Sequence, residues 1–123
     1  MSSESIVRLH ARATVKASDW QTFKQMVAET REVVKKEGPE SVLTHECYFD
    51  PATFECLIIE AYASEAALLT HLEMIKPVSE KYKVDWKINR LELFGGYSKD
   101  LIDVMRQAVD DHSFNHYPSL LLQ

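Results

Sequence analysis

The chain has 123 residues and a formal net charge of −5, from 14 lysine and arginine residues against 19 aspartate and glutamate residues. Apolar residues make up 46% and charged residues 27%, proportions typical of one soluble globular domain. The acidic balance argues against a nucleic-acid partner, because neutralising phosphates needs a basic face. No stretch approaches the roughly 20 apolar residues of a membrane span. Only two cysteines occur and the first residues are polar and acidic, so we expect a cytoplasmic protein with reduced thiols.

The first elements expected along the chain are a strand and a helix. Residues 6–16 alternate between apolar and polar side chains, which predicts a strand with one apolar side. Ser18 and Gln21 have the spacing of a capping box, and apolar residues then recur at helical spacing as far as Lys36. Gly38 and the proline after it predict the end of this helix.

Two strands over residues 42–49 and 54–63 are expected to form a hairpin, with residues 50–53 as its turn. If Phe49 pairs with Phe54, then Cys47 lies opposite Cys56, and His45 lies opposite Ile58. Side chains of alternate positions share a face. One face then carries His45, Cys47, Phe49, Phe54, Cys56, Ile58, Glu60 and Tyr62. We interpret the two cysteines as small apolar packing residues rather than as a disulfide.

A second helix is expected from its cap at Ser64 to about residue 74. Pro77 fits the first turn of a separate short helical piece over residues 78–83. Residues 88–94 form a further strand that ends at a pair of glycines.

Ser98 begins a third helix, and the aromatic and aliphatic tail over residues 112–123 is expected to dock on the protein. His112 and His116 have the spacing of two ligands on a helix, but the composition around them favours a tail over a metal site. We therefore divide the chain into a domain over residues 1–97 and a C-terminal helical extension over residues 98–123. The extension is expected to pack on the domain or on a partner subunit.

The order β-α-β-β-α-β predicts an α+β, ferredoxin-like sheet with its helices on one face. The opposite face would be open and partly apolar, with Leu57, Ile59 and Ala61 on one strand and Val42 opposite them. A second copy of the chain would cover such a face most simply, so we expect a homodimer.

The run over residues 57–68, followed by His71, resembles the signature of the antibiotic biosynthesis monooxygenase-like domain: an apolar strand, Glu60, an aromatic residue and a Glu-Ala-Ala-Leu helix start. Residues 37–39 and 48–51 are similar to another passage of that family, and the resemblance covers about residues 5–96. It implies a dimeric α/β barrel with one pocket per subunit between sheet and helices.

The resemblance also implies which residues form the site. Glu60 matches the strand carboxylate, Tyr62 the pocket aromatic and His71 the helix histidine, while His45 stands where the family commonly has tyrosine. The implied activity is oxygenation of a quinol-like or polycyclic phenolic molecule without metal or other cofactor. Glu60 or His45 would be the base, and His71 or Tyr62 would donate to an oxyanion. Because Phe49, Phe54 and Ile58 share the hairpin face of Tyr62, we expect them to join it in contacting the small apolar or aromatic ligand.

Other interpretations stay open at this point. Glu60 could be a structural carboxylate bonded to Arg90, His71 or a backbone group. The chain could be a non-catalytic small-molecule-binding or stress-response dimer of the same fold, because residues 73–79 lack the histidine segment that many active members carry. Haem binding, with His71 or His45 as the ligand, is a third hypothesis.

Overall fold

The computed structural model describes residues 5–121 and contains one five-stranded sheet. Its elements are β1 (Val7–Val15), α1 (Trp20–Glu37), β2 (Val42–Asp50), β3 (Glu55–Tyr62), α2 (Glu65–Lys81), β4 (Trp86–Phe94), α3 (Lys99–Arg106) and β5 (Phe114–Tyr117), with short 3-10 turns at Ala17–Asp19 and Asp111–Ser113. The strand order is β2-β3-β1-β4-β5, and only β5 runs parallel to its neighbour. The predicted ferredoxin-like α+β fold is confirmed.

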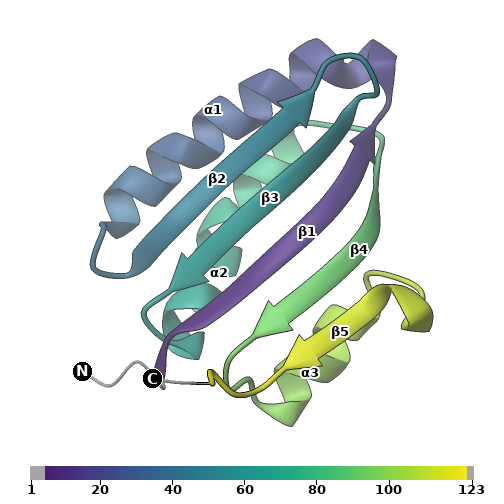
Figure 1. Cartoon of the computed structure of the whole chain (residues 1–123). Helices are drawn as coiled ribbons and strands as arrows, with labels where there is room; N and C mark the ends of the chain where they lie inside the picture. Colours follow the sequence, from purple (N-terminus) through teal and green to yellow (C-terminus); the bar gives the residue numbers. More distant parts are fainter. Residues whose placement is uncertain (1–4, 122–123) are drawn as a thin grey trace.

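The helices lie behind the sheet in the view of Figure 1, and the core lies between the two layers. The alternating apolar residues of β1 face this core and are buried along the whole strand. Two apolar clusters fill it. One joins β1, β3 and β4 to α2 and α3 through residues such as Tyr62, Leu68 and Leu101. The other lies around Phe23 of α1, at the opposite end of β1.

The hairpin has a different register from the one expected. Asp50 pairs with Glu55, so residues 51–54 form the turn and Phe54 adopts a left-handed φ of 59°. The turn closes through the N–H of Phe54, which donates to the carbonyl of Asp50 at 2.9 Å. The shift is two residues, and an even shift keeps each side chain on its expected face. The predicted pairings were therefore wrong, whereas the predicted faces of the paired strand residues hold.

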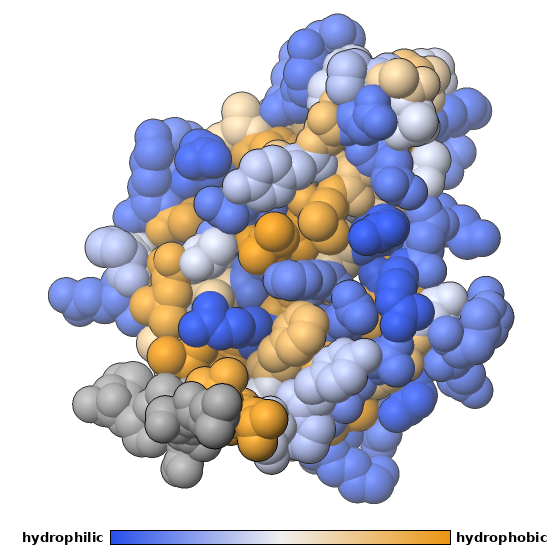
Figure 2. All heavy atoms as spheres, in the orientation of Figure 1, coloured by the Kyte–Doolittle hydropathy of each residue, from blue (hydrophilic) through white to orange (hydrophobic). Residues whose placement is uncertain are grey.

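Val42 lies on the core face and not on the open face. The register shifts between Val42 and Thr44, which brings Val42 opposite Tyr62, and its side chain packs in the first core cluster. A bulge of this kind adds one residue to a strand and so exchanges the faces beyond it. The open face, seen in Figure 2, carries apolar atoms interrupted by polar side chains.

Two expectations for the second half of the chain need correction. α2 is one helix that continues through Pro77, not two pieces. Pro77 and Glu73, whose carbonyl loses its helical donor, are both exposed, so water can hydrate that carbonyl. The C-terminal extension is not purely helical. After α3, β5 pairs with residues Leu91–Phe94 of β4, and Phe114 enters the core.

No helix within residues 5–121 is both long enough and apolar enough to cross a membrane.

Candidate functional site

His45 of β2 and Glu60 of β3 form a directly opposed pair on the core face of the sheet. Nε2 of His45 lies 3.9 Å from Oε1 of Glu60, and the two side chains are 17% and 14% exposed. Burial is the largest influence on His45 and lowers its pKa below the ordinary value, whereas the charge of Glu60 acts in the opposite direction. His45 is therefore a neutral imidazole at pH 7, held beside a carboxylate.

Tyr62 extends this pair along β3. Its side chain is fully buried, and its hydroxyl donates a hydrogen bond to Oε1 of Glu60. Residues two apart on a strand share a face, which is why this contact forms within one strand. Burial first, and then the charge of Glu60, raise the pKa of Tyr62 well above its usual range. Tyr62 is therefore a permanent donor to the Glu60 carboxylate at physiological pH.

His71 of α2 lies above the sheet and is held by Glu37, which was not predicted as a site residue from the sequence. Both carboxylate oxygens of Glu37, the last residue of α1, lie 3.0 Å from Nδ1 of His71. The two side chains are only 3% and 1% exposed. The sequence marks Glu37 by its place directly before the helix-ending Gly38 and by the resemblance of residues 37–39 to the family, but neither assigns it a contact with His71.

These side chains form one polar cluster, which we call the 45–60–71 cluster after His45, Glu60 and His71. The two imidazole centroids are 5.1 Å apart, and Tyr62 lies 5.3 Å from His71. One donor atom from each of the three residues lies within 4.8 Å of the others. The cluster can accept a proton at His45, retain a negative charge at Glu60 and donate a hydrogen bond at Tyr62.

The structure does not place all the expected ligand-binding residues beside this cluster. Phe49 stacks on Trp20 with a centroid distance of 3.4 Å, and Phe54 meets the edge of Phe49. Phe49 belongs to the second core cluster, together with Cys56, and Phe54 contacts that cluster through Phe49. Ile58 packs against the first core cluster, so it lies between the two regions. Four residues were expected to contact the ligand. Of these, Tyr62 lies directly beside the acidic residue of the site, through its hydrogen bond to Glu60.

The two cysteines are free. Cys47 pairs across the hairpin with Ile58, and Phe49 pairs with Cys56. The thiol of Cys56 donates to that of Cys47, which lowers the pKa of Cys47 and, with burial, raises that of Cys56. The direct cross-strand pairing of the cysteines was therefore wrong, but the two thiols still touch diagonally.

The sequence offered alternative roles for Arg90, His116 and His71, and their contacts in the structure can be compared with those roles. Arg90 bonds to Asn115 and lies 3.5 Å from Glu92, on the opposite face from Glu60. His116 donates from Nε2 to the carbonyl of Gly95 at 2.7 Å. For haem, His71 is a poor ligand, because its side chain is only 1% exposed and the face of a porphyrin cannot reach it.

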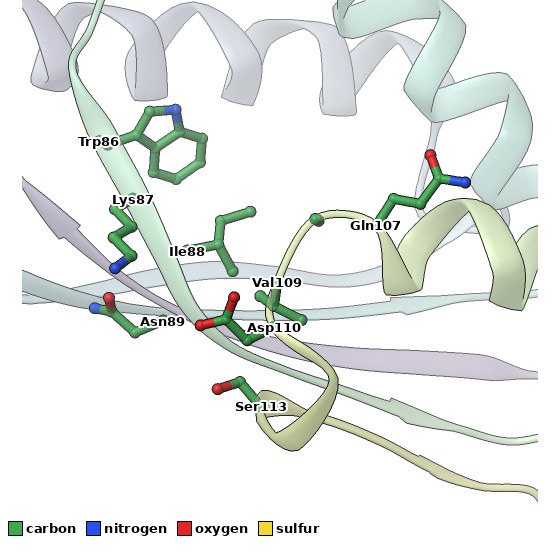
Figure 3. Close-up of a pocket in the computed structure, with 9 residues that line it drawn as sticks. Trp86, Lys87, Ile88, Asn89, Gln107, Val109, Asp110 and Ser113 are labelled. Carbon is green, nitrogen blue, oxygen red and sulfur yellow. The ribbon is translucent and has the colours of Figure 1, made fainter.

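Two surface pockets are prominent among residues 5–121, and neither is lined by the 45–60–71 cluster. The first, of about 630 Å³, lies where β5 leaves the first half of β4 uncovered (Figure 3). Trp86, Lys87 and Asn89 line one side of it, and Asp110 and Ser113 line the other. The second, of about 540 Å³, lies on the open face around Arg8, His10 and Phe94. Access to the cluster is instead through the partly exposed side chains of His45 and Glu60.

No family model matches the sequence, and no curated protein matches it. Solved structures do match. MupZ from Pseudomonas fluorescens superposes with a TM-score of 0.70 at 17% identity, covering 97% of this chain and 93% of that chain. A "Putative antibiotic biosynthesis monooxygenase" from Bacteroides thetaiotaomicron gives a TM-score of 0.61 at 20% identity, covering 80% of this chain and 93% of that one. A protein of the same name from Nitrosomonas europaea gives 0.56 at 14% identity, covering 80% and 97%.

At these identities the likeness concerns the fold. The shared part includes the β-α-β-β-α-β order that positions His45, Glu60 and His71, and in MupZ it extends over nearly the whole chain. The chain thus has the ferredoxin-like fold of the antibiotic biosynthesis monooxygenase-like proteins.

Proposed function

We propose that the protein is a small-molecule monooxygenase that oxidises a quinol-like or polycyclic phenolic substrate with O₂ and uses no metal or flavin. The observation that carries the proposal is the opposed pair of His45 and Glu60, a neutral imidazole beside a carboxylate in a partly buried site. Solved structures with the same fold that bear the name of antibiotic biosynthesis monooxygenases support the reaction class.

The substrate supplies all the electrons in this reaction. The base removes a proton from the activated carbon or its phenol, and the resulting anion gives one electron to O₂. The substrate radical and superoxide combine to form a carbon–oxygen bond. The peroxide then loses water as its O–O bond breaks and a second proton leaves the carbon. For an activated methylene group the balance is CH₂ + O₂ → C=O + H₂O, so no external reductant is needed.

The residues of the cluster have separate parts in this proposal. His45 accepts the proton, and Glu60 stabilises the imidazolium that forms 3.9 Å away. Tyr62 keeps the Glu60 carboxylate in place by its hydrogen bond. His71, fixed at Nδ1 by Glu37, presents its other nitrogen to the cluster and can donate to a developing oxyanion when protonated.

We also propose that the active form is a homodimer closed by the open faces of two sheets. Leu57 and Ile59 are half-buried on that face within one chain, beside the charged side chains of Arg8 and Arg12. A second copy would cover this apolar surface and complete a barrel. Localisation in the cytoplasm agrees with the two free thiols.

A non-catalytic ligand-binding dimer is the second candidate. It is favoured by the two prominent pockets, because neither contacts the 45–60–71 cluster. Oxygen uptake separates the candidates: the purified protein is mixed with a panel of hydroquinones and anthrones, and consumption is compared with autoxidation. Uptake above autoxidation that His45→Gln reduces supports the oxygenase. Saturable binding of a panel member without uptake supports the binding protein.

A further inference from the structure

We propose that His45, Glu60 and His71 together form a binding site for one divalent first-row transition-metal ion, with Zn²⁺ as the ion that the donor set fits best. The proposal goes beyond the oxygenase activity and does not depend on it, because it concerns the resting protein.

The three side chains offer two imidazole nitrogens and one carboxylate oxygen, all within 4.8 Å of one another. Two histidines and one carboxylate are a donor set found in zinc and non-haem iron sites. The donors come from β2, β3 and α2, three elements fixed by the sheet and by the core. Donors around a tetrahedral Zn²⁺ are about 3.3 Å apart for metal–ligand distances near 2.0–2.1 Å. Donor atoms that are 4.8 Å apart would have to approach one another by up to about 1.5 Å to hold the ion.

An independent observation concerns Nε2 of His71. This nitrogen is buried and has no hydrogen-bond partner among the described residues, while its other nitrogen is bound by Glu37. A buried polar atom without a partner is costly and needs an explanation. A metal ion in the 45–60–71 cluster would use the lone pair of this nitrogen.

In such a site Glu37 would be the carboxylate that bonds to a metal-binding histidine without touching the ion itself. Histidine ligands of metals commonly donate their second N–H to a carboxylate, which fixes the tautomer and turns the other nitrogen toward the ion. Glu37 does this at Nδ1 of His71, with both oxygens at 3.0 Å and a side chain that is 3% exposed. The tautomer with the proton on Nδ1 is therefore favoured, and it leaves Nε2 free to bind metal.

The charges of the cluster also favour a cation. Glu37 and Glu60 are two carboxylates with little exposure, and their ion-pair partners among the described residues are the imidazoles of His71 and His45. A divalent ion among these groups would compensate both negative charges, and buried charges need such compensation. The ion would occupy the lone pairs of His45 and Glu60 that the proposed oxygenase uses, so Zn²⁺ is expected to inhibit that reaction.

Metal binding is tested on the full chain without substrate. Chelator-treated protein is titrated with Zn²⁺ by calorimetry, and with Co²⁺ by visible absorption, which reports the ligand atoms. Mg²⁺, which prefers an octahedral shell of oxygens, serves as the ion that should not bind. The variants are His45→Ala, Glu60→Gln and Glu37→Gln, and His112→Ala is the matched control because His112 is exposed and far along the chain in the Asp111–Ser113 turn.

The expected result is one Zn²⁺ per chain, with Co²⁺ bands typical of nitrogen and oxygen ligands. Glu37→Gln should weaken binding by about 10–100-fold, the usual effect of losing an outer carboxylate. His45→Ala and Glu60→Gln should weaken it more, and His112→Ala should not change it.

Three results would overturn the site: no Zn²⁺ binding by wild-type protein, equal affinity in wild type and His45→Ala, or thiolate-to-cobalt absorption that places the ion at Cys47. His45 is partly exposed, so its replacement tests the site even if a variant at buried Glu37 does not fold. None of these measurements involves oxygen or a phenolic substrate. Failure of the metal site is therefore distinct from failure of the proposed oxygenase.

Discussion

The carboxylate of Glu37 and the imidazole of His71 join the end of α1 to the middle of α2 through a buried contact between residues 34 apart in sequence. Both oxygens lie 3.0 Å from Nδ1, so the ring can neither turn nor lose this partner without leaving a polar group unpaired in the core. The contact fixes the helix layer above the His45–Glu60 pair. It therefore couples the stability of the fold to the geometry of the candidate site.

Glu37→Ala should lower the free energy of unfolding by about 3 kcal/mol, the size expected when one partner of a buried pair is removed. Urea denaturation measures the change. Glu29→Ala is the matched control, because Glu29 joins the same two helices through Lys81 in an exposed pair. Glu29→Ala should lower the free energy of unfolding clearly less than Glu37→Ala does. Equal losses in the two variants would show that Glu37 contributes no more than a surface ion pair.

Gly95→Ala should destabilise the protein by about 2–4 kcal/mol. Gly95 has a φ of 108°, and an added Cβ would lie 2.7 Å from the carbonyl oxygen of Ile6. Gly96→Ala is the neighbouring control, because its Cβ would meet nothing within 4 Å, and its effect should stay within about 0.5 kcal/mol. Thermal unfolding of both variants checks this, and a loss at Gly96 as large as at Gly95 would contradict it.

The fold could be predicted because its signals are local. Alternation along β1, the cap at Ser64, the cap at Ser98 and the glycines after β4 each mark one element without knowledge of its neighbours. β5 could not be predicted in this way. It has only four residues, and its pairing with Leu91–Phe94 depends on α3 returning the chain to the sheet edge.

The predicted register of the hairpin was wrong for a specific reason. Phe54 looks like a strand residue in the sequence, but it takes the left-handed position of the turn. Aromatic residues rarely occupy that region, so the pattern favours a turn that ends one residue earlier. The corrected register improves the candidate site, since it places His45 directly opposite Glu60 instead of one row away.

Four of the five residues of the candidate site, His45, Glu60, Tyr62 and His71, were predicted from the sequence. Glu60 draws attention as a charge in an apolar strand, and His45 and Tyr62 share its face by parity alone. Glu37 was not visible, because it ends a run of charged residues at a helix terminus and its partner lies on another helix. Phe49 was expected near the site because of parity, but it lies further along the strand, against Trp20.

The stability of the protein should fall as the pH drops below 6.5, and His45 should contribute to the fall. Burial lowers the pKa of His45 below its ordinary value of 6.5, so the unfolded chain takes up this proton at a higher pH than the folded chain does. The contribution of His45 to the free energy of unfolding is therefore fully present above pH 6.5, and it is lost as the pH falls toward the pKa of His45 in the folded state. His45→Gln should reduce the slope of unfolding free energy against pH in this range. An unchanged or steeper slope would contradict the lowered pKa.

Ile59→Arg should convert the proposed homodimer into a monomer. Ile59 pairs with His10 on the open face of the sheet, which the second copy would cover, and an arginine there would bury an unpaired charge in the interface. Light scattering after size exclusion gives the mass directly. Glu32→Arg on the exposed side of α1 is the control for the added charge. A wild-type monomer, or a dimer that persists in Ile59→Arg, would rule out this interface.

The fate of labelled oxygen shows directly whether His45 and Glu60 activate a substrate for reaction with O₂. Metal-free wild-type protein is incubated with ¹⁸O₂ and each anthrone or hydroquinone that it consumes, and the product is analysed by mass spectrometry beside His45→Gln and Glu60→Gln. We expect one ¹⁸O atom per product molecule from the wild type and a large loss of turnover in both variants, with folding retained by circular dichroism. Labelled product formed equally fast by folded His45→Gln and Glu60→Gln would contradict the assignment of the base. Product formed only at the autoxidation rate by the wild type would contradict the proposed activity on these substrates.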